Sequence, residues 1–178
     1  MKHVDSVLSR RRFIQAGGLW VLCAPWAALP ASNSPVVDVA MGGSQGGAHV
    51  WFRPTGIWIV PGQAVRWTNR DSGNSHTATA YHPSLYGKPL RIPTAATPWD
   101  SGFLLPGESF SVTFTHPGVY DYYCLPHEMA GMVGRIVVGE PDTQGWQDQP
   151  ESDAGLPAPA LRNFPSVERI LKERSVDL

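Results

Sequence analysis

Short runs of alternating apolar and polar residues, separated by glycine and proline turns, constrain the fold of this 178-residue chain more than any other feature. Gly and Pro together make up nearly a fifth of the sequence, with 18 and 17 residues, and both residue types form tight turns and end strands. Residues 64–68 and 109–114 alternate strictly, so that Val65 and Trp67 point to one face of their strand. This pattern favours an all-β fold over a helical one.

The spacing of these runs predicts about seven or eight short strands, as in a β-sandwich or barrel. The expected strands cover residues 36–40, 49–52, 57–60, 64–68, 76–80, 109–114, 119–124 and 133–138. Residues 81–101 interrupt the series with four prolines. We expect an irregular crossing there, because proline cannot donate a hydrogen bond within a sheet.

The first 31 residues have the character of an export signal. Residues 9–15, SRRRFIQ, closely match the twin-arginine pattern, and the apolar run 19–29 that follows is too short to span a bilayer, which needs about 20 helical residues. Ala31 ends an acceptable cleavage site before Ser32. We therefore expect residues 1–31 to be a twin-arginine signal peptide and the mature protein to be periplasmic or otherwise extracytoplasmic, without stable membrane insertion after signal removal.

The remaining sequence divides into a folded domain and a tail. Residues 32–139 contain all the expected strands, whereas residues 140–178 are rich in Pro, Gln and Asp, with helical spacing only at 166–174. We expect one domain followed by a tail with one short helix. The mature chain carries a net charge of about −4, and this mildly acidic balance argues against a nucleic-acid partner.

One loop between two expected strands combines the donor groups of a metal site. Cys124, His127 and Met132 place a thiolate, an imidazole and a thioether within nine residues. One Cys, two His and a weakly held Met form the set that copper uses for electron transfer. His76 qualifies as the second imidazole, because it begins an expected strand at the same end of the sandwich. Cys124 is also the only cysteine after the signal peptide, so it cannot form an internal disulfide.

The pattern Cys-x-Pro-His-x-x-x-Gly-Met-x-Gly at 124–134, preceded by Tyr-x-Tyr-Tyr, resembles the copper loop of plastocyanins and their bacterial and archaeal relatives. Residues 61–69 and 105–110 resemble the same family, and the resemblance covers roughly residues 36–139. It implies a cupredoxin Greek-key β-sandwich and a mononuclear type 1 (blue) copper site cycling between Cu(II) and Cu(I). The ligands that it implies are His76, Cys124 and His127 in the plane and Met132 on the axis.

Two features depart from or complicate the family pattern. The family usually has Asn after its first histidine ligand, where this chain has Thr77, so we expect a weaker or different side-chain lock on the copper loop. Met129 offers a competing thioether, but the family spacing of four residues between His and Met selects Met132. The other histidines after the signal peptide are expected to be ordinary surface or packing residues. These are His49, His82 and His116.

The resemblance also implies partners. We expect a monomer that docks transiently with redox proteins, an electron donor and an acceptor, at an apolar patch around the ring edge of His127. Tyr123 is expected either to lie on a second, more distant electron route or to be a packed strand aromatic.

Three other functions share part of this ligand set. An extracytoplasmic copper carrier or storage protein usually has Met- or His-rich stretches, and this chain has only four Met, including Met1. Multicopper oxidases and copper nitrite reductases use this fold at least twice and add His-only copper sites, but we expect one domain here and find no His-x-His pair. The binuclear copper domain of terminal oxidases needs two loop cysteines, and this loop has only Cys124. A structural zinc site favours several Cys or His ligands rather than Met. We therefore expect an electron carrier and not an enzyme.

Overall fold

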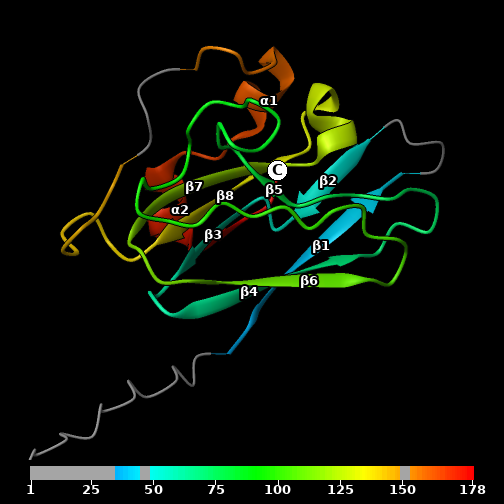
Figure 1. Cartoon of the computed structure of the whole chain (residues 1–178). Helices are drawn as coiled ribbons and strands as arrows, with labels where there is room; N and C mark the ends of the chain where they lie inside the picture. Colours follow the sequence, from blue (N-terminus) through cyan, green and yellow to red (C-terminus); the bar gives the residue numbers. More distant parts are fainter. Residues whose placement is uncertain (1–34, 45–48, 149–152) are drawn as a thin grey trace, which may run out of the picture. The chain divides into compact units, whose positions relative to one another are not determined.

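The computed structural model describes residues 35–44, 49–148 and 153–178 (Figure 1). The expected signal peptide, residues 1–31, lies outside the described residues. Within the described part of the chain, no helix is both long enough and apolar enough to cross a bilayer.

The described residues form two β-sheets, three short helices and the loops between them (Figure 1). The strands are β1 (Val37–Gly43), β2 (Val50–Arg53), β3 (Gly56–Ile59), β4 (Gln63–Asn69), β5 (Thr79–Ala80), β6 (Ser109–Phe114), β7 (Gly118–Tyr123), β8 (Val133–Val138) and β9 (Ser175–Val176). The helices are the 3-10 helix η2 (Leu125–Ala130), α1 (Ala158–Asn163) and α2 (Val167–Glu173). One sheet has the order β2-β1-β4-β6 and the other β5-β7-β8-β3-β9. The all-β sandwich predicted from the sequence is confirmed.

The alternation of β4 sets which residues enter the core. Val65 and Trp67 are fully buried, whereas Arg66 between them is exposed and pairs with Asp38 on β1 at 2.6 Å. Burying an aromatic side chain of this size removes a large apolar area from water. The strand therefore contributes its apolar face to the space between the sheets, as the sequence predicted.

Trp67 lies in an aromatic cluster that also fixes the irregular crossing. Its ring stacks on Trp99 at 5.9 Å and meets Phe114 and Tyr122 edge to face at 6.3 Å and 5.3 Å. Trp99 belongs to residues 81–101, which form only turns and isolated bridges, as expected from their prolines. Burial of Trp99 thus holds a segment without regular structure against the sheets.

The C-terminal tail forms more structure than expected. We predicted one short helix at 166–174, and the chain has α2 there, but α1 and β9 are present as well. Strand β9 pairs antiparallel with the edge of β3, with Gly56 opposite Val176. A sequence of this composition does not reveal these elements, because tertiary contacts rather than local periodicity hold them.

A buried ion cluster anchors this tail. Asp121 on β7 accepts hydrogen bonds from Arg91 at 2.8 Å and from Arg135 at 2.7 Å, and Asp121 and Arg91 have no exposed side-chain surface. The ring of Phe164 lies 5.4 Å from the Arg91 guanidinium and 5.0 Å from that of Arg135. Arg135 also donates to the carbonyl of Pro165 at 2.9 Å. The tail is therefore tied to β7 and β8 by charge-assisted and cation–π contacts.

Candidate metal centre

The loop between β7 and β8 folds back on itself within one helical turn. Cys124 is extended (φ −94°, ψ 117°) and precedes η2, where Pro126 occupies the first turn and lacks an N–H that the turn would leave unpaired. The His127 N–H donates to the Cys124 carbonyl at 3.0 Å. This turn brings Nδ1 of His127 to 3.3 Å from Sγ of Cys124.

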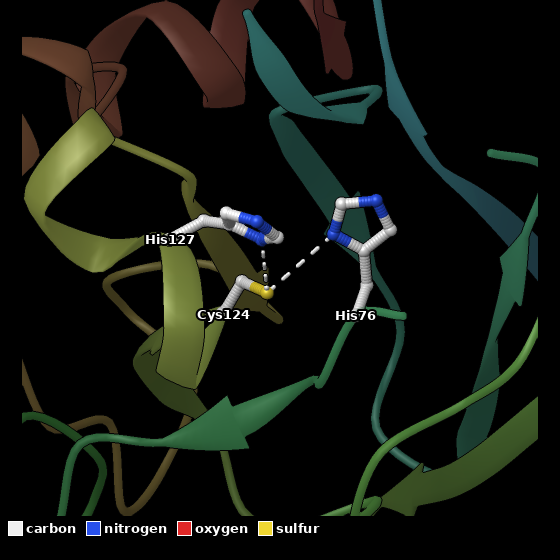
Figure 2. A group of neighbouring side chains, drawn as sticks. All are labelled: His76, Cys124 and His127. Carbon is white, nitrogen blue, oxygen red and sulfur yellow. Dashed lines mark hydrogen bonds between the residues drawn. The ribbon is translucent and has the colours of Figure 1, made fainter. Parts of the chain in front are cut away.

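His76 reaches the same sulfur from a distant part of the chain. The expected strand 76–80 is shorter than predicted, since only Thr79–Ala80 is a strand, and His76 instead forms an isolated bridge with Leu104. Two backbone hydrogen bonds, of 3.2 Å and 2.8 Å, fix that bridge. Nδ1 of His76 lies 3.6 Å from Sγ of Cys124, and Figure 2 shows both imidazole rings turned toward the sulfur.

The three donor atoms fit a single metal ion. Sγ of Cys124 and a ring nitrogen of both His76 and His127 all lie within 4.8 Å of one another, and this is the one such cluster of His, Cys, Asp and Glu that the described residues contain. Donor atoms bound to one ion through bonds of about 2.0–2.3 Å are separated by roughly 3–4 Å. One thiolate with two imidazoles is the in-plane donor set of a copper electron-transfer site.

Met132 and Met129 differ sharply in position. Met132 is fully buried, its carbonyl accepts from the Cys124 N–H at 3.0 Å, and its N–H donates to the His127 carbonyl at 3.1 Å. Met129 is 72% exposed on η2. The backbone of Met132 is thus hydrogen-bonded to two residues of the cluster, and its role as axial ligand stays a prediction.

Burial sets the charge state of the cluster. It raises the pKa of the Cys124 thiol to about 11, because a thiolate loses solvation there. Burial is the main cause that lowers the pKa of His127, and the neighbouring His76 is the second. The lower pKa favours the neutral imidazole of His127, whose unprotonated nitrogen can bind a metal. A metal cation would replace the thiol proton, so binding would release a proton.

A carboxylate behind His76 was missed in the sequence, where residues 69–75 read only as a polar turn. Nε2 of His76 lies 3.1 Å from Oδ2 of Asp71, which is buried. The side chain of Asn74 and the N–H of Gly73 donate to this carboxylate, and the Asn74 bond is the first cause that lowers the pKa of Asp71 to about 2. An ionised carboxylate holds the proton of His76 on Nε2, which leaves Nδ1 to face the sulfur.

Thr77, which stands where the family usually has Asn, contacts both Cys124 and the residue that follows it. Its N–H donates to Sγ of Cys124 at 3.3 Å, and its hydroxyl oxygen accepts from the Leu125 N–H at 2.8 Å. In this chain the side-chain contact between residue 77 and the copper loop is therefore made by a hydroxyl group.

The other aromatic and imidazole side chains lie outside the cluster. His82 bonds through Nδ1 to the Ser84 hydroxyl at 2.7 Å, and neither His49 nor His116 joins the three clustered residues. Tyr123 is fully buried, as expected for a packed strand aromatic.

Comparison with known proteins places the chain in one family. Residues 37–139 match the model of copper binding proteins of the plastocyanin/azurin family. Chloroplastic plastocyanin of Fritillaria agrestis is 34% identical over 71% of this chain and 74% of its own length, and that of Tetradesmus obliquus is 33% identical over 76% and 86%.

Solved structures also match. The pseudoazurin of Methylobacterium extorquens AM1 is 28% identical over 60% of this chain and 76% of its own, with a TM-score of 0.46. A purple cupredoxin from Nitrosopumilus maritimus is 26% identical over 58% and 99%, with a TM-score of 0.44. The family model and the clustered thiol and imidazoles agree, and the chain belongs to the plastocyanin/azurin family of copper-binding electron carriers.

Proposed function

We propose that this chain is an extracytoplasmic single-electron carrier in which His76, Cys124, His127 and Met132 bind one copper ion. The observation that carries the proposal is the convergence of one thiol and two imidazoles within 4.8 Å. A copper ion bound there supplies a one-electron Cu(II)/Cu(I) couple. The protein forms and breaks no substrate bond in this role, and we propose no enzymatic activity.

The surrounding residues favour fast electron exchange because they fix the positions of the metal-binding side chains. His76 is fixed by its bridge to Leu104 and by Asp71, and Cys124 by the N–H of Thr77. All three of these partners belong to segments outside the copper loop. A site whose ligands keep their positions needs little rearrangement between oxidation states, and outer contacts of this kind tune a metal site.

Burial supports Met132 rather than Met129 as the axial ligand. Met132 has no exposed surface and follows Gly131, whose left-handed conformation (φ +82°) ends η2 and turns the chain back toward Cys124. Met129 is largely exposed. A weak thioether ligand is retained only where the fold keeps it in place.

We propose that redox partners dock around His127. The His127 ring is partly exposed, and an apolar rim of exposed residues belongs to η2 and to the segment that pairs with His76. The rim consists of Phe103, Leu105, Pro126 and Met129. Exposed apolar patches commonly mark interaction sites, and electron-transfer partners usually meet through small, short-lived interfaces. The proposed resting state is a monomer.

The twin-arginine motif at 9–15 supports export of the folded protein. We propose that residues 1–31 are the signal peptide, 32–139 the copper domain and 140–178 a tail docked on it.

Voltammetry of the copper-loaded protein lacking residues 1–31 tests the function, and one pair of variants tests the axial ligand. We expect a reversible one-electron wave that Met132→Leu shifts and Met129→Leu leaves unchanged. A copper carrier or storage protein would instead hold Cu(I) in a colourless form and show no reversible wave. Equal shifts in the two variants would contradict the assignment of Met132.

A further inference from the structure

We infer that Asp100, which is not a metal ligand, is a positioning residue for the copper loop and acts through the hydroxyl groups of Thr79 and Thr77. The inference rests on the proposed function, because it concerns how the same loop is held. The observation behind it is an unbroken chain of hydrogen bonds from the Asp100 carboxylate to the backbone of Leu125.

This chain of hydrogen bonds, which we call the relay, consists of short bonds that run through two buried hydroxyl groups. Thr79 Oγ1 lies 2.9 Å from Oδ1 of Asp100 and 2.9 Å from Oγ1 of Thr77. The Leu125 N–H donates to Thr77 Oγ1 at 2.8 Å. Thr77 and Thr79 are 1% and 0% exposed, so both hydroxyl groups are buried and depend on these bonds.

The carboxylate gives the relay a direction. An ionised carboxylate only accepts hydrogen bonds, whereas each hydroxyl has one proton to donate. The Thr79 proton therefore points to Asp100, and the Thr77 proton points to Thr79. A lone pair of Thr77 is then left to accept the Leu125 N–H.

The relay ends beside the ligand sulfur. Leu125 follows Cys124 directly, and the N–H of Thr77 itself donates to Sγ of Cys124 at 3.3 Å. Thr77 thus holds the loop by its side chain and the sulfur by its backbone. Hydrogen bonding to this sulfur tunes the reduction potential of a blue copper site. Because such a bond withdraws electron density from the sulfur, loosening it favours Cu(II) and lowers the potential.

The two oxygens of Asp100 have different partners, and this difference supplies a control. Oδ1 accepts from Thr79 and from the Gly102 N–H at 3.1 Å. Oδ2 accepts from the hydroxyl of Tyr86 at 2.9 Å, and Tyr86 is 58% exposed. Removing the Tyr86 hydroxyl takes away a bond to the same carboxylate without breaking the relay.

The test compares Thr79→Val, Thr79→Ser and Tyr86→Phe. Thr79→Val keeps the shape but removes the hydroxyl, so we expect a lower reduction potential in the copper-loaded protein. In the copper-free protein we expect the Leu125 amide to exchange its hydrogen about fivefold faster, as for loss of one ordinary hydrogen bond. Thr79→Ser and Tyr86→Phe should keep wild-type values in both measurements.

Asp100→Ala adds a second reading, since it removes the acceptor of the Thr79 hydroxyl. We expect the potential and the Leu125 exchange rate to move in the same direction as in Thr79→Val. Wild-type values in Thr79→Val, or an equal change in Thr79→Ser, would overturn the inference. The exchange measurement needs no copper, so it tests the relay even if the wild-type protein fails to show a reversible copper wave, a result that would refute only the proposed function.

Discussion

The two sides of Cys124 differ in almost every physical respect. On the His127 side, the chain turns through the short helix η2 and leaves an imidazole and the apolar side chain of Met129 at the surface. On the Tyr123 side, the strand continues into the core, and Tyr123 has no exposed surface. Both neighbours are aromatic or imidazole side chains close to the ligand sulfur in sequence, yet only one is accessible to a partner.

The cover over Tyr123 comes from three separate segments. The ring of Tyr81 lies 4.4 Å away and the ammonium group of Lys88 lies 5.0 Å from the ring centre. Lys88 pairs with the buried Glu128 of η2, to which the Tyr81 hydroxyl donates at 2.9 Å. Ala160 of α1 belongs to the same apolar cluster, and Figure 1 shows α1 beside η2. This difference in exposure supports the proposal that redox partners approach His127 rather than Tyr123.

The largest effect is expected on the stability of the protein, at the buried ion cluster that anchors the C-terminal tail. Asp121→Asn should lower the free energy of unfolding by about 3–5 kcal/mol, because it leaves the buried guanidinium groups of Arg91 and Arg135 without their shared carboxylate. Urea denaturation of the copper-free protein measures this. The matched control is Glu173→Gln in the exposed pair with Arg169, which should cost less than about 1 kcal/mol. Equal losses in the two variants would show that the ion cluster does not anchor the tail.

A smaller effect is expected on the rate of electron exchange when the exposed apolar rim near His127 is changed. Leu105→Glu should slow electron exchange with a partner protein by about tenfold, since a charge in an apolar docking patch must be desolvated. Stopped-flow mixing measures the rate, and the spectrum of the copper site should not change. Val36→Glu is the control, because Val36 is 46% exposed and precedes β1 far from the ligand loop in sequence. If both variants reacted equally fast, docking at this rim would be excluded.

Tyr81 and Tyr123, whose ring centres lie 4.4 Å apart, should differ in how much their hydroxyl groups contribute to stability. Tyr81→Phe should destabilise the protein by about 1.5–3 kcal/mol, because its hydroxyl donates to the carboxylate of Glu128. Tyr123→Phe should be neutral or slightly stabilising, since the Tyr123 hydroxyl is buried and has no hydrogen-bond partner among the described residues. Thermal or urea unfolding measures the stability of the two variants. Tyr123→Phe should also leave the rate of electron exchange with a partner protein unchanged. A slower electron exchange would contradict the proposal that electrons pass through His127 alone.

The sequence predicted the parts of the molecule that follow local rules. Alternation identified the buried face of β4, and the spacing of Cys124 and His127 identified the metal loop. His76 was harder to predict, since its place depends on the bridge to Leu104 rather than on the strand expected there. The expected position at one end of the sandwich and the resemblance to the family together selected His76 as a candidate ligand.

Contacts between distant segments could not be predicted in the same way. Asp71 is a turn residue in sequence, and only the fold aims its carboxylate at His76. Asp121 lies within a strand pattern that gives no sign of two guanidinium partners from other elements. Helix α1 and strand β9 depend on tertiary packing, which short segments without strong periodicity do not reveal.

The most direct test is the visible absorption and electron paramagnetic resonance spectrum of the copper-loaded protein lacking residues 1–31. We predict an intense visible band and the narrow copper splitting of a thiolate-bound type 1 centre, with one copper per chain, and loss of both in Cys124→Ser. A weak, pale Cu(II) spectrum that Cys124→Ser leaves unchanged would contradict copper binding by Cys124, His76 and His127.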